Sequence, residues 1–192
     1  MEQENIEIED LKVLSQSEVN ILYEMFEYLV SILNKYAIRY ACSGGTLLGA
    51  IRHGGLISWD DDVDITIEKE DVPLLLHLKY IFTDGDKYQL VRVGKYMKLK
   101  KDNMFIDIFI IEKGVFPQQH YQKYNFNEDE YYPLQESMFG DIQVKIPHKS
   151  IEYLNRTFPN WCSEAWIYNH RIKGTKKISL NNEMKKPYLR FS

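Results

Sequence analysis

The segment SWDDDVDITI, residues 58–67, constrains the fold of this chain more than any other. Its four aspartates, Asp60, Asp61, Asp62 and Asp64, lie within five positions. From Asp62 onward polar and apolar residues alternate, which predicts a half-buried strand over 62–67 with Asp62, Asp64 and Thr66 on one face. Carboxylates this close repel one another and are seldom buried unless they are paired or bind a cation. The segment therefore predicts a strand that needs a positive charge from outside the sequence.

The rest of the chain predicts an α+β or α/β-type protein with a small mixed sheet. Ser15 and Glu18 have the spacing of a capping box ahead of a helical run of apolar residues. The other predicted helices cover 46–53, 70–79 and 148–158. The other predicted strands cover 38–42, 88–93, 96–100, 104–111 and 141–147. We expect an irregular carboxyl-terminal half, with a long loop over 117–133 and a solvated lysine-rich tail over 173–186, in a single domain of 192 residues.

Three aspartates are candidate metal ligands. Asp62 and Asp64 are two residues apart on one strand, so their oxygens can chelate one cation together. Such hard ligands suit Mg²⁺ or Mn²⁺, and Mg²⁺ characteristically bridges a few carboxylates to substrate phosphates. Asp107 lies in the apolar run of a later strand and reaches the same site if the two strands are neighbours. The alternatives are a solvated turn, a calcium loop, and an aspartate that accepts backbone amides.

The glycine pair supplies the other half of a phosphate site. Ser43, Gly44 and Gly45 lie between a predicted strand and a predicted helix, where backbone amides can approach a phosphate closely. A tight turn with no ligand is the alternative. Phosphoryl transfer rests mainly on positioning and charge neutralisation, so acids and amides together predict a site for that chemistry.

Several residues around this core have two interpretations. Arg52 either contacts a donor phosphate or forms a salt bridge to a nearby aspartate. Lys98 and Lys100 share one face of the strand beside Asp107, where an ammonium meets either a phosphate or solvent. We expect His53 to be structural and Trp59 to pack under the acidic segment.

The overall charge and the ends of the chain set further limits. A net charge of −4 and a pI near 5.8 argue against nucleic acid as a partner. The acidic start MEQENIEIED is unlike a signal peptide, and no apolar run is long enough to span a membrane. We therefore expect a soluble, cytoplasmic protein. The two cysteines, Cys42 and Cys162, lack metal-site spacing, and we expect both to be inert core residues.

Longer motifs resemble one known family. GGTLLGAIRHGGLISWDDDVDI is similar to the signature of the LicD family, which includes bacterial phosphocholine transferases, fukutin and fukutin-related protein. FIDIFIIE, YPLQESMFGDIQVKIP and EYLNRTFPNW extend the resemblance over most of the chain after residue 37. The resemblance implies a minimal nucleotidyltransferase (polymerase beta-like) fold, with core motifs in 38–111 and a family-like extension in 132–161. The family pattern falls on Gly44, Gly45, Asp62, Asp64 and Asp107.

The resemblance also implies an activity. Family members move a phospho-substituent, such as phosphocholine or phosphoribitol, from a CDP-linked donor to a hydroxyl of a glycan or glycolipid acceptor. In this interpretation Ser43, Gly44, Gly45, Arg52 and Lys98 contact the donor. The three aspartates would hold Mg²⁺ or Mn²⁺, with the third as a further ligand or as the acceptor base. The alternatives are a true nucleotidyltransferase that uses a nucleoside triphosphate, and a binding module without catalysis.

Overall fold

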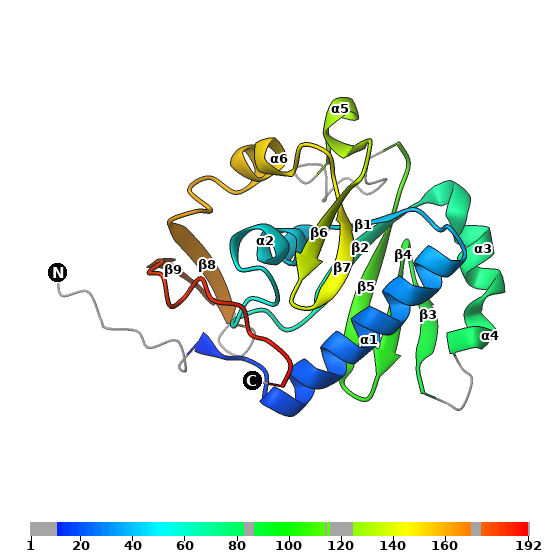
Figure 1. The fold of residues 1–192 in the computed structure, drawn as a ribbon, viewed down its shortest axis with the longest axis horizontal. Helices are drawn as coiled ribbons and strands as arrows, with labels where there is room; N and C mark the ends of the chain where they lie inside the picture. Colours follow the sequence, from blue (N-terminus) through cyan, green and yellow to red (C-terminus); the bar gives the residue numbers. More distant parts are fainter. Residues whose placement is uncertain (1–10, 83–86, 114, 116–124, 170–173, 192) are drawn as a thin grey trace.

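The protein is an α+β structure built on a mixed five-stranded sheet (Figure 1). The computed structural model describes residues 11–82, 87–113, 115, 125–169 and 174–191, so residues 117–124 of the expected loop lie outside it. The strand order is β1-β2-β5-β4-β3, with β2 and β5 parallel and the other neighbours antiparallel. The strands are β1 (Tyr40–Cys42), β2 (Val63–Glu68), β3 (Gln89–Val93), β4 (Tyr96–Lys101) and β5 (Met104–Ile111). The predicted strands of the first half and the mixed sheet are confirmed.

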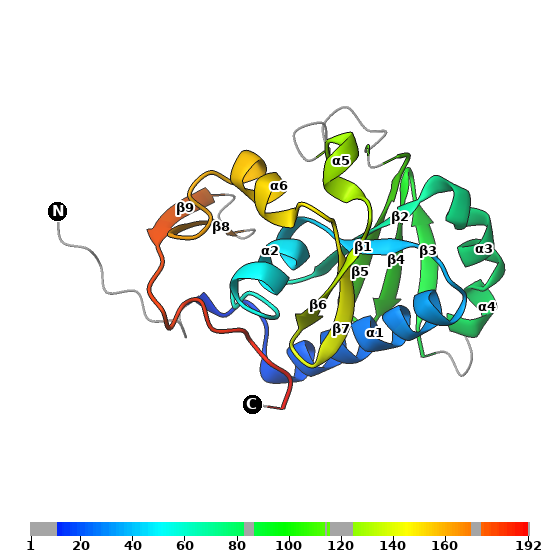
Figure 2. The ribbon, with the colours of Figure 1, turned by 45° about the horizontal axis from the view of Figure 1, so that its top comes forward.

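The longest helix, α1 (Gln16–Lys35), lies across one face of this sheet, as Figures 1 and 2 show. The predicted capping box is present: the Ser15 amide donates to the Glu18 carboxylate at 2.8 Å, and the Glu18 amide donates to the Ser15 hydroxyl at 3.4 Å. Apolar residues of the helix and of the sheet strands are buried in one cluster. Burial of these apolar residues holds α1 against the sheet and fixes which strand residues face the opposite side.

A second group of elements covers the β1–β2 half of the sheet. The short helix α2 (Gly44–Arg52) packs against β2 and against β6 (Gln135–Phe139). β6 pairs with β7 (Ile142–Ile146), which lies beside β1 (Figure 2). The sequence analysis predicted β7 but not β6, because three of the five residues of β6 are exposed and its sequence shows no apolar alternation.

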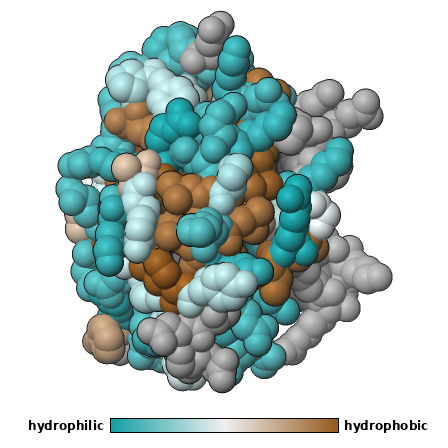
Figure 3. All heavy atoms as spheres, turned by 90° about the vertical axis from the view of Figure 1, so that its right-hand side faces the viewer, coloured by the Kyte–Doolittle hydropathy of each residue, from teal (hydrophilic) through white to brown (hydrophobic). Residues whose placement is uncertain are grey.

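The remaining helices are short. The predicted helix over 70–79 is broken into η2 (Lys69–Asp71), α3 (Val72–His77) and α4 (Lys79–Phe82). Two more are α5 (Glu128–Tyr131), inside the stretch expected to be a loop, and α6 (Ser150–Thr157), which ends just before Pro159. Seen from the α3–α4 side, apolar side chains gather inside a hydrophilic rim (Figure 3). Leu74 of α3 and Val93 of β3 are among the exposed apolar residues of the chain.

The carboxyl-terminal region differs from the expectation of a solvated tail. β8 (Glu164–Asn169) and β9 (Gly174–Ser179) form an antiparallel hairpin, and Ala165, Ile178 and Met184 form a small buried cluster. Lys176, Lys177 and Lys186 are exposed, as expected of a solvated segment, but the hairpin was missed because β9 has a single inward apolar residue, Ile178, among polar ones. The prediction for Cys162 was also wrong: it is exposed, whereas Cys42 is buried as expected. None of the described helices has the length and apolar character needed to cross a membrane.

Candidate functional site

One row of side chains crosses the sheet at the level of Asp64. The register pairs Asp64 of β2 with Asp107 of β5, and Asp107 with Lys98 of β4. Ser43, which follows β1, extends the β1–β2 ladder by donating its amide to the Asp64 carbonyl at 3.0 Å. Residues paired across neighbouring strands point to the same face. Four polar side chains from four segments therefore share one face, and the expectation that the strands of Asp64 and Asp107 are neighbours is confirmed.

Three of the predicted acids converge on this face. Oxygens of Asp62, Asp64 and Asp107 lie within 4.8 Å of one another, which suits a set of hard ligands around one divalent cation. Burial raises the pKa of Asp64 well above its usual value, and the charges of Asp62, Asp60 and Asp107 raise it further. Without a cation these like charges oppose one another. The donor set therefore fits Mg²⁺ or Mn²⁺, and the binding of either remains a prediction.

Asp60 is a fourth acid of this cluster, which the sequence analysis did not treat as part of the site. Oxygens of Asp60, Asp61 and Asp62 also lie within 4.8 Å of one another. Burial, followed by the charges of Asp62 and Asp61, raises the pKa of Asp60 to about 8. The run of aspartates was the signal in the sequence, but Asp60 precedes the alternating segment, so the strand pattern could not place it.

The glycine pair brings the start of α2 against these acids. Gly44 has a φ of +50°, and a Cβ there would lie 2.5 Å from an oxygen of Asp64. A Cβ on Gly45 would lie 2.2 Å from an oxygen of Asp60. A hydrogen bond from the Gly45 backbone opposes the rise in the pKa of Asp64. A side chain at either glycine would therefore have to push one of these carboxylates away from the start of α2.

Two hydroxyl groups complete this corner. The Asp64 amide donates to Thr46 Oγ1 at 2.7 Å, which ties the first turn of α2 to β2. The sequence analysis missed Thr46, although its place directly after the glycine pair was a usable signal. Within the described residues, Ser43 Oγ is buried and has no hydrogen-bond partner. Thr66, which shares the face of the acids, is fully buried with its hydroxyl 2.8 Å from that of Tyr131, so the face is closed beyond Asp64.

Lys98 contacts an acid, which is neither of the two predicted alternatives. Its Nζ lies 2.7 Å from Asp107 Oδ1 and 3.6 Å from the centre of the Phe105 ring. Burial raises the pKa of Asp107, and the ammonium opposes that rise. Lys98 thus places a cation at the edge of the acid cluster, held by an ion pair and a cation–π contact.

Arg52 and His53 hold the carboxyl end of α2 against the last part of the chain. Arg52 Nη1 donates to the carbonyls of Trp161 at 2.7 Å and Glu164 at 3.3 Å. Burial lowers the pKa of Arg52 to about 10, and nearby Asp60 has a smaller, opposite effect. His53 Nε2 lies 3.0 Å from the Met184 carbonyl, and burial lowers its pKa to about 4. Arg52 Nη1 is thus hydrogen-bonded to backbone carbonyls. A contact between Arg52 and a phosphate of the CDP-linked substrate stays a prediction.

His53 has the structural role predicted for it and Trp59 packs as predicted, but the packing of Trp59 is against His53 and the carboxyl-terminal cluster, and its place under the acidic segment stays a prediction. His53 and Trp59 meet edge to face with ring centres 5.6 Å apart. Trp59 packs against the small carboxyl-terminal cluster of Ala165, Ile178 and Met184. These contacts anchor the loop that leads into the acidic segment.

Comparison with known proteins identifies relatives of this chain. Residues 37–149 match the family described as LicD/FKTN/FKRP, nucleotidyltransferase domain. An uncharacterized protein of Rickettsia prowazekii (strain Madrid E) is 34% identical over 185 residues, which cover 86% of this chain and 68% of that protein. The lipopolysaccharide cholinephosphotransferase LicD of Haemophilus influenzae is 28% identical over 111 residues, which cover 48% of this chain and 42% of LicD.

A longer match is to the mouse ribitol 5-phosphate transferase FKRP, 28% identical over 152 residues that cover 71% of this chain and 31% of FKRP. This chain thus spans less than half the length of LicD and less than a third of FKRP. Among solved structures, the lincosamide antibiotic adenylyltransferase LnuA overlaps with 70% of this chain and 85% of its own at 17% identity. The TM-score of that overlap is 0.47.

Proposed function

Because the chain belongs to the LicD/FKTN/FKRP nucleotidyltransferase-domain family, we propose that it is a metal-dependent phosphotransferase. It would move a phospho-substituent from a CDP-linked donor to a hydroxyl of a glycan acceptor. The observation that carries the proposal is the convergence of Asp62, Asp64 and Asp107 within 4.8 Å beside a glycine turn. Relatives named as a cholinephosphotransferase and a ribitol 5-phosphate transferase support the reaction class. The transferred group and the acceptor of this chain are proposals, since it spans only part of those relatives.

The acids have the role of holding the metal. Asp62, directly before β2, and Asp64 would supply its first oxygen ligands, because their oxygens lie within 4.8 Å of each other and a cation relieves the repulsion between them. When bound, Mg²⁺ or Mn²⁺ neutralises charge on the donor diphosphate and on the phosphoryl group in transfer.

The start of α2 and Lys98 have the role of positioning the donor. The amides at Gly44 and Gly45 lie at a helix amino terminus, where an anion is favoured. The buried Ser43 hydroxyl shares the face of Asp64 and is available to a phosphate oxygen. Lys98 lies on the far side of Asp107, so a diphosphate across the acid row would have cationic or donor groups on both sides.

The reaction is a displacement at phosphorus. The acceptor hydroxyl oxygen forms a bond to the phosphorus of the phospho-substituent, and the bond from that phosphorus to the bridging oxygen of the diphosphate breaks. CMP leaves with the electron pair of that bond. The hydroxyl proton passes to Asp107 if this carboxylate is the base, or to solvent if Asp107 is instead a metal ligand.

The test is a donor panel of CDP-choline, CDP-ribitol, CDP-glycerol and CTP, each with Mg²⁺ or Mn²⁺ and a glycan acceptor. We expect CMP to be released from one CDP-linked donor, and the release to stop in EDTA. Release of pyrophosphate from CTP would instead identify a true nucleotidyltransferase. This second candidate is suggested by the words 'nucleotidyltransferase domain' in the description of the matched family. Tight binding of CDP and metal with no product from any donor would identify a binding module.

A further inference from the structure

The β3–β4 hairpin concentrates positive charge in an otherwise acidic protein. Of the 24 Lys and Arg in the chain, six lie within residues 87–101, which contain no Asp or Glu. The rest of the chain is left with 18 Lys and Arg against all 28 Asp and Glu. The six basic residues are Lys87, Arg92, Lys95, Lys98, Lys100 and Lys101. Charged side chains, lysine above all, keep an edge strand from pairing with another strand, but only Arg92 of the six lies on the edge strand β3, so edge protection alone does not account for the others.

Part of this charge is not neutralised within the protein. Lys87 and Lys101 pair with Glu24 of α1, at 2.6 and 3.5 Å. Lys98 pairs with Asp107. Lys95 and Lys100 are exposed and have no ion-pair partner among the described residues. The hairpin therefore retains a surplus of positive charge that an outside group can use.

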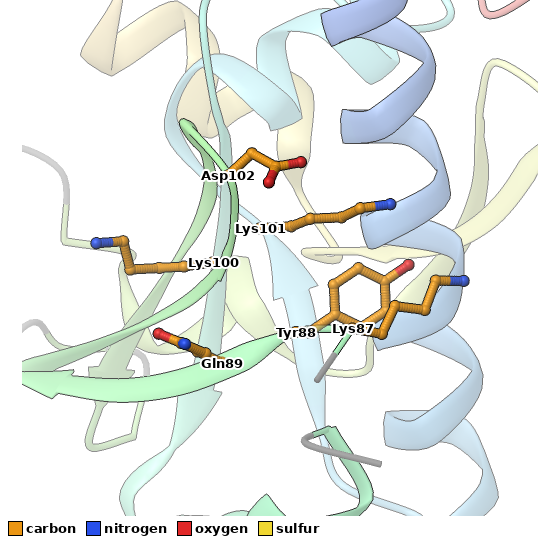
Figure 4. Close-up of a pocket in the computed structure, with 6 residues that line it drawn as sticks. All are labelled: Lys87, Tyr88, Gln89, Lys100, Lys101 and Asp102. Carbon is orange, nitrogen blue, oxygen red and sulfur yellow. The ribbon is translucent and has the colours of Figure 1, made fainter. Parts of the chain in front are cut away.

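The base of the hairpin also contains a cavity. It has a volume of about 350 Å³ and is lined by Lys87, Tyr88, Gln89, Lys100, Lys101 and Asp102 (Figure 4). Figure 4 shows Lys100 and Gln89 on one side of the strands, and Lys101, Tyr88 and Lys87 on the side of α1. Lys87 and Lys101 on the α1 side are paired with Glu24, and Asp102 adds a carboxylate to the lining. The positive charge that this lining offers to an outside anion is therefore that of the exposed Lys100, on the other side of the strands.

The hairpin lies next to the acid row, on the side away from β1 and α2. Lys98 pairs in register with Asp107, and Lys100 is two residues farther along the same face of β4, about 7 Å away. The start of α2 and Lys98 are both assigned to the donor, on either side of the acids. A second substrate that approaches beyond Lys98 therefore meets the remaining exposed lysines of the hairpin, Lys95 and Lys100.

From these observations, and resting on the proposed function, we infer that the β3–β4 hairpin binds an anionic group carried by the acceptor. The group is a phosphate, carboxylate or sulfate on the glycan, near the hydroxyl that reacts. The basic hairpin offsets the repulsion that the acid cluster and the net negative chain exert on such an acceptor.

The test measures binding, so that it does not depend on turnover. Labelled dextran sulfate oligosaccharides and unsulfated dextran of the same length are titrated into the full chain with CDP and Mg²⁺ present. We expect only the sulfated probe to bind, with an affinity that falls as salt rises. The variant Lys95→Glu/Lys100→Glu should bind it about tenfold more weakly at low salt, since exposed charge pairs contribute modestly and add up when several act together.

The matched control is Lys35→Glu/Lys186→Glu, which changes the net charge equally at two exposed positions outside the hairpin. It should change the affinity less than about twofold. Equal weakening in both variants, or no binding of the sulfated probe, overturns the inference. Tighter binding of duplex DNA or of phosphatidylglycerol vesicles, lost in the hairpin variant, also overturns it in favour of another partner. Failure of the donor panel with this binding intact would count against the proposed activity and not against the surface.

Discussion

From the acid cluster we predict opposite effects of Asp62→Asn/Asp64→Asn on stability without metal and with it. In the metal-free protein, carboxylates within 4.8 Å repel one another. Two unit charges at that distance interact with about 3 kcal/mol at an effective dielectric constant of about 20. Partial protonation lowers this energy, as the raised pKa of Asp64 indicates. We expect the variant to be more stable than the wild type by about 1–3 kcal/mol, which raises Tm by about 3–10 °C.

With metal the order reverses. A ligand at one hundred times its Kd stabilises the folded state by about 2.7 kcal/mol, so saturating Mg²⁺ should raise the wild-type Tm by about 5–10 °C. The variant should gain nothing. The assay is thermal unfolding in EDTA and in Mg²⁺, followed by circular dichroism. The matched control, Asp102→Asn/Asp129→Asn, removes two carboxylates from exposed positions outside the cluster and should keep the full shift.

Two results would refute this reasoning separately. A metal-dependent shift of equal size in Asp62→Asn/Asp64→Asn would remove both residues from the metal site. A variant less stable than the wild type in EDTA would show that hydrogen bonds to the carboxylates outweigh their repulsion.

Three further predictions concern single positions. Gly44→Ala and Gly54→Ala both place a side chain at positive φ, and each should lower the unfolding free energy by about 1–2 kcal/mol. Only Gly44→Ala should also reduce the Mg²⁺-dependent shift in Tm, because its Cβ would lie 2.5 Å from an oxygen of Asp64. Because the pKa of His53 is lowered to about 4, its contribution to the unfolding free energy is complete above pH 6.5 and falls by about 3 kcal/mol as the pH drops to 4. The unfolding free energy of His53→Gln, measured in urea, should not show that loss. If Asp107 is the base, Asp107→Asn should keep its metal-dependent affinity for CDP, measured by calorimetry, and lose about 10²-fold to 10⁴-fold in turnover, measured as CMP release. A parallel loss of affinity and turnover would make Asp107 a metal ligand.

The parts of the fold that could be predicted from sequence are those whose signal is local. The capping box at Ser15 and the apolar period behind it place α1, and the alternation after Asp62 places β2. The convergence of Asp64 and Asp107 required only that their strands be neighbours, which the apolar character of both strands made reasonable. Each of these depends on spacing within one element or on one pairing.

The failures concern contacts between distant segments. No local pattern indicates that Arg52 donates to the carbonyls of Trp161 and Glu164, because every residue has a backbone carbonyl and the sequence does not distinguish those that accept. β6 and β9 carry too few apolar residues to show a period, since each belongs to a two-stranded sheet with much of its surface in solvent. Residues shaped by long-range packing therefore had the least predictable roles.

The sheet topology also explains why the charges of the site come from separate segments. β2 and β5 are the one parallel pair in the described sheet, and between them the chain passes through the three short helices η2, α3 and α4 and the basic hairpin. Because β4 is antiparallel to β5, the hairpin that closes this connection brings Lys98 opposite Asp107. Asp64, Asp107 and Lys98 are thus held on paired strands, whose geometry does not depend on the side chains at the exposed hairpin positions. Changes at Lys95 and Lys100 should therefore act through charge and leave the geometry of the acid row intact.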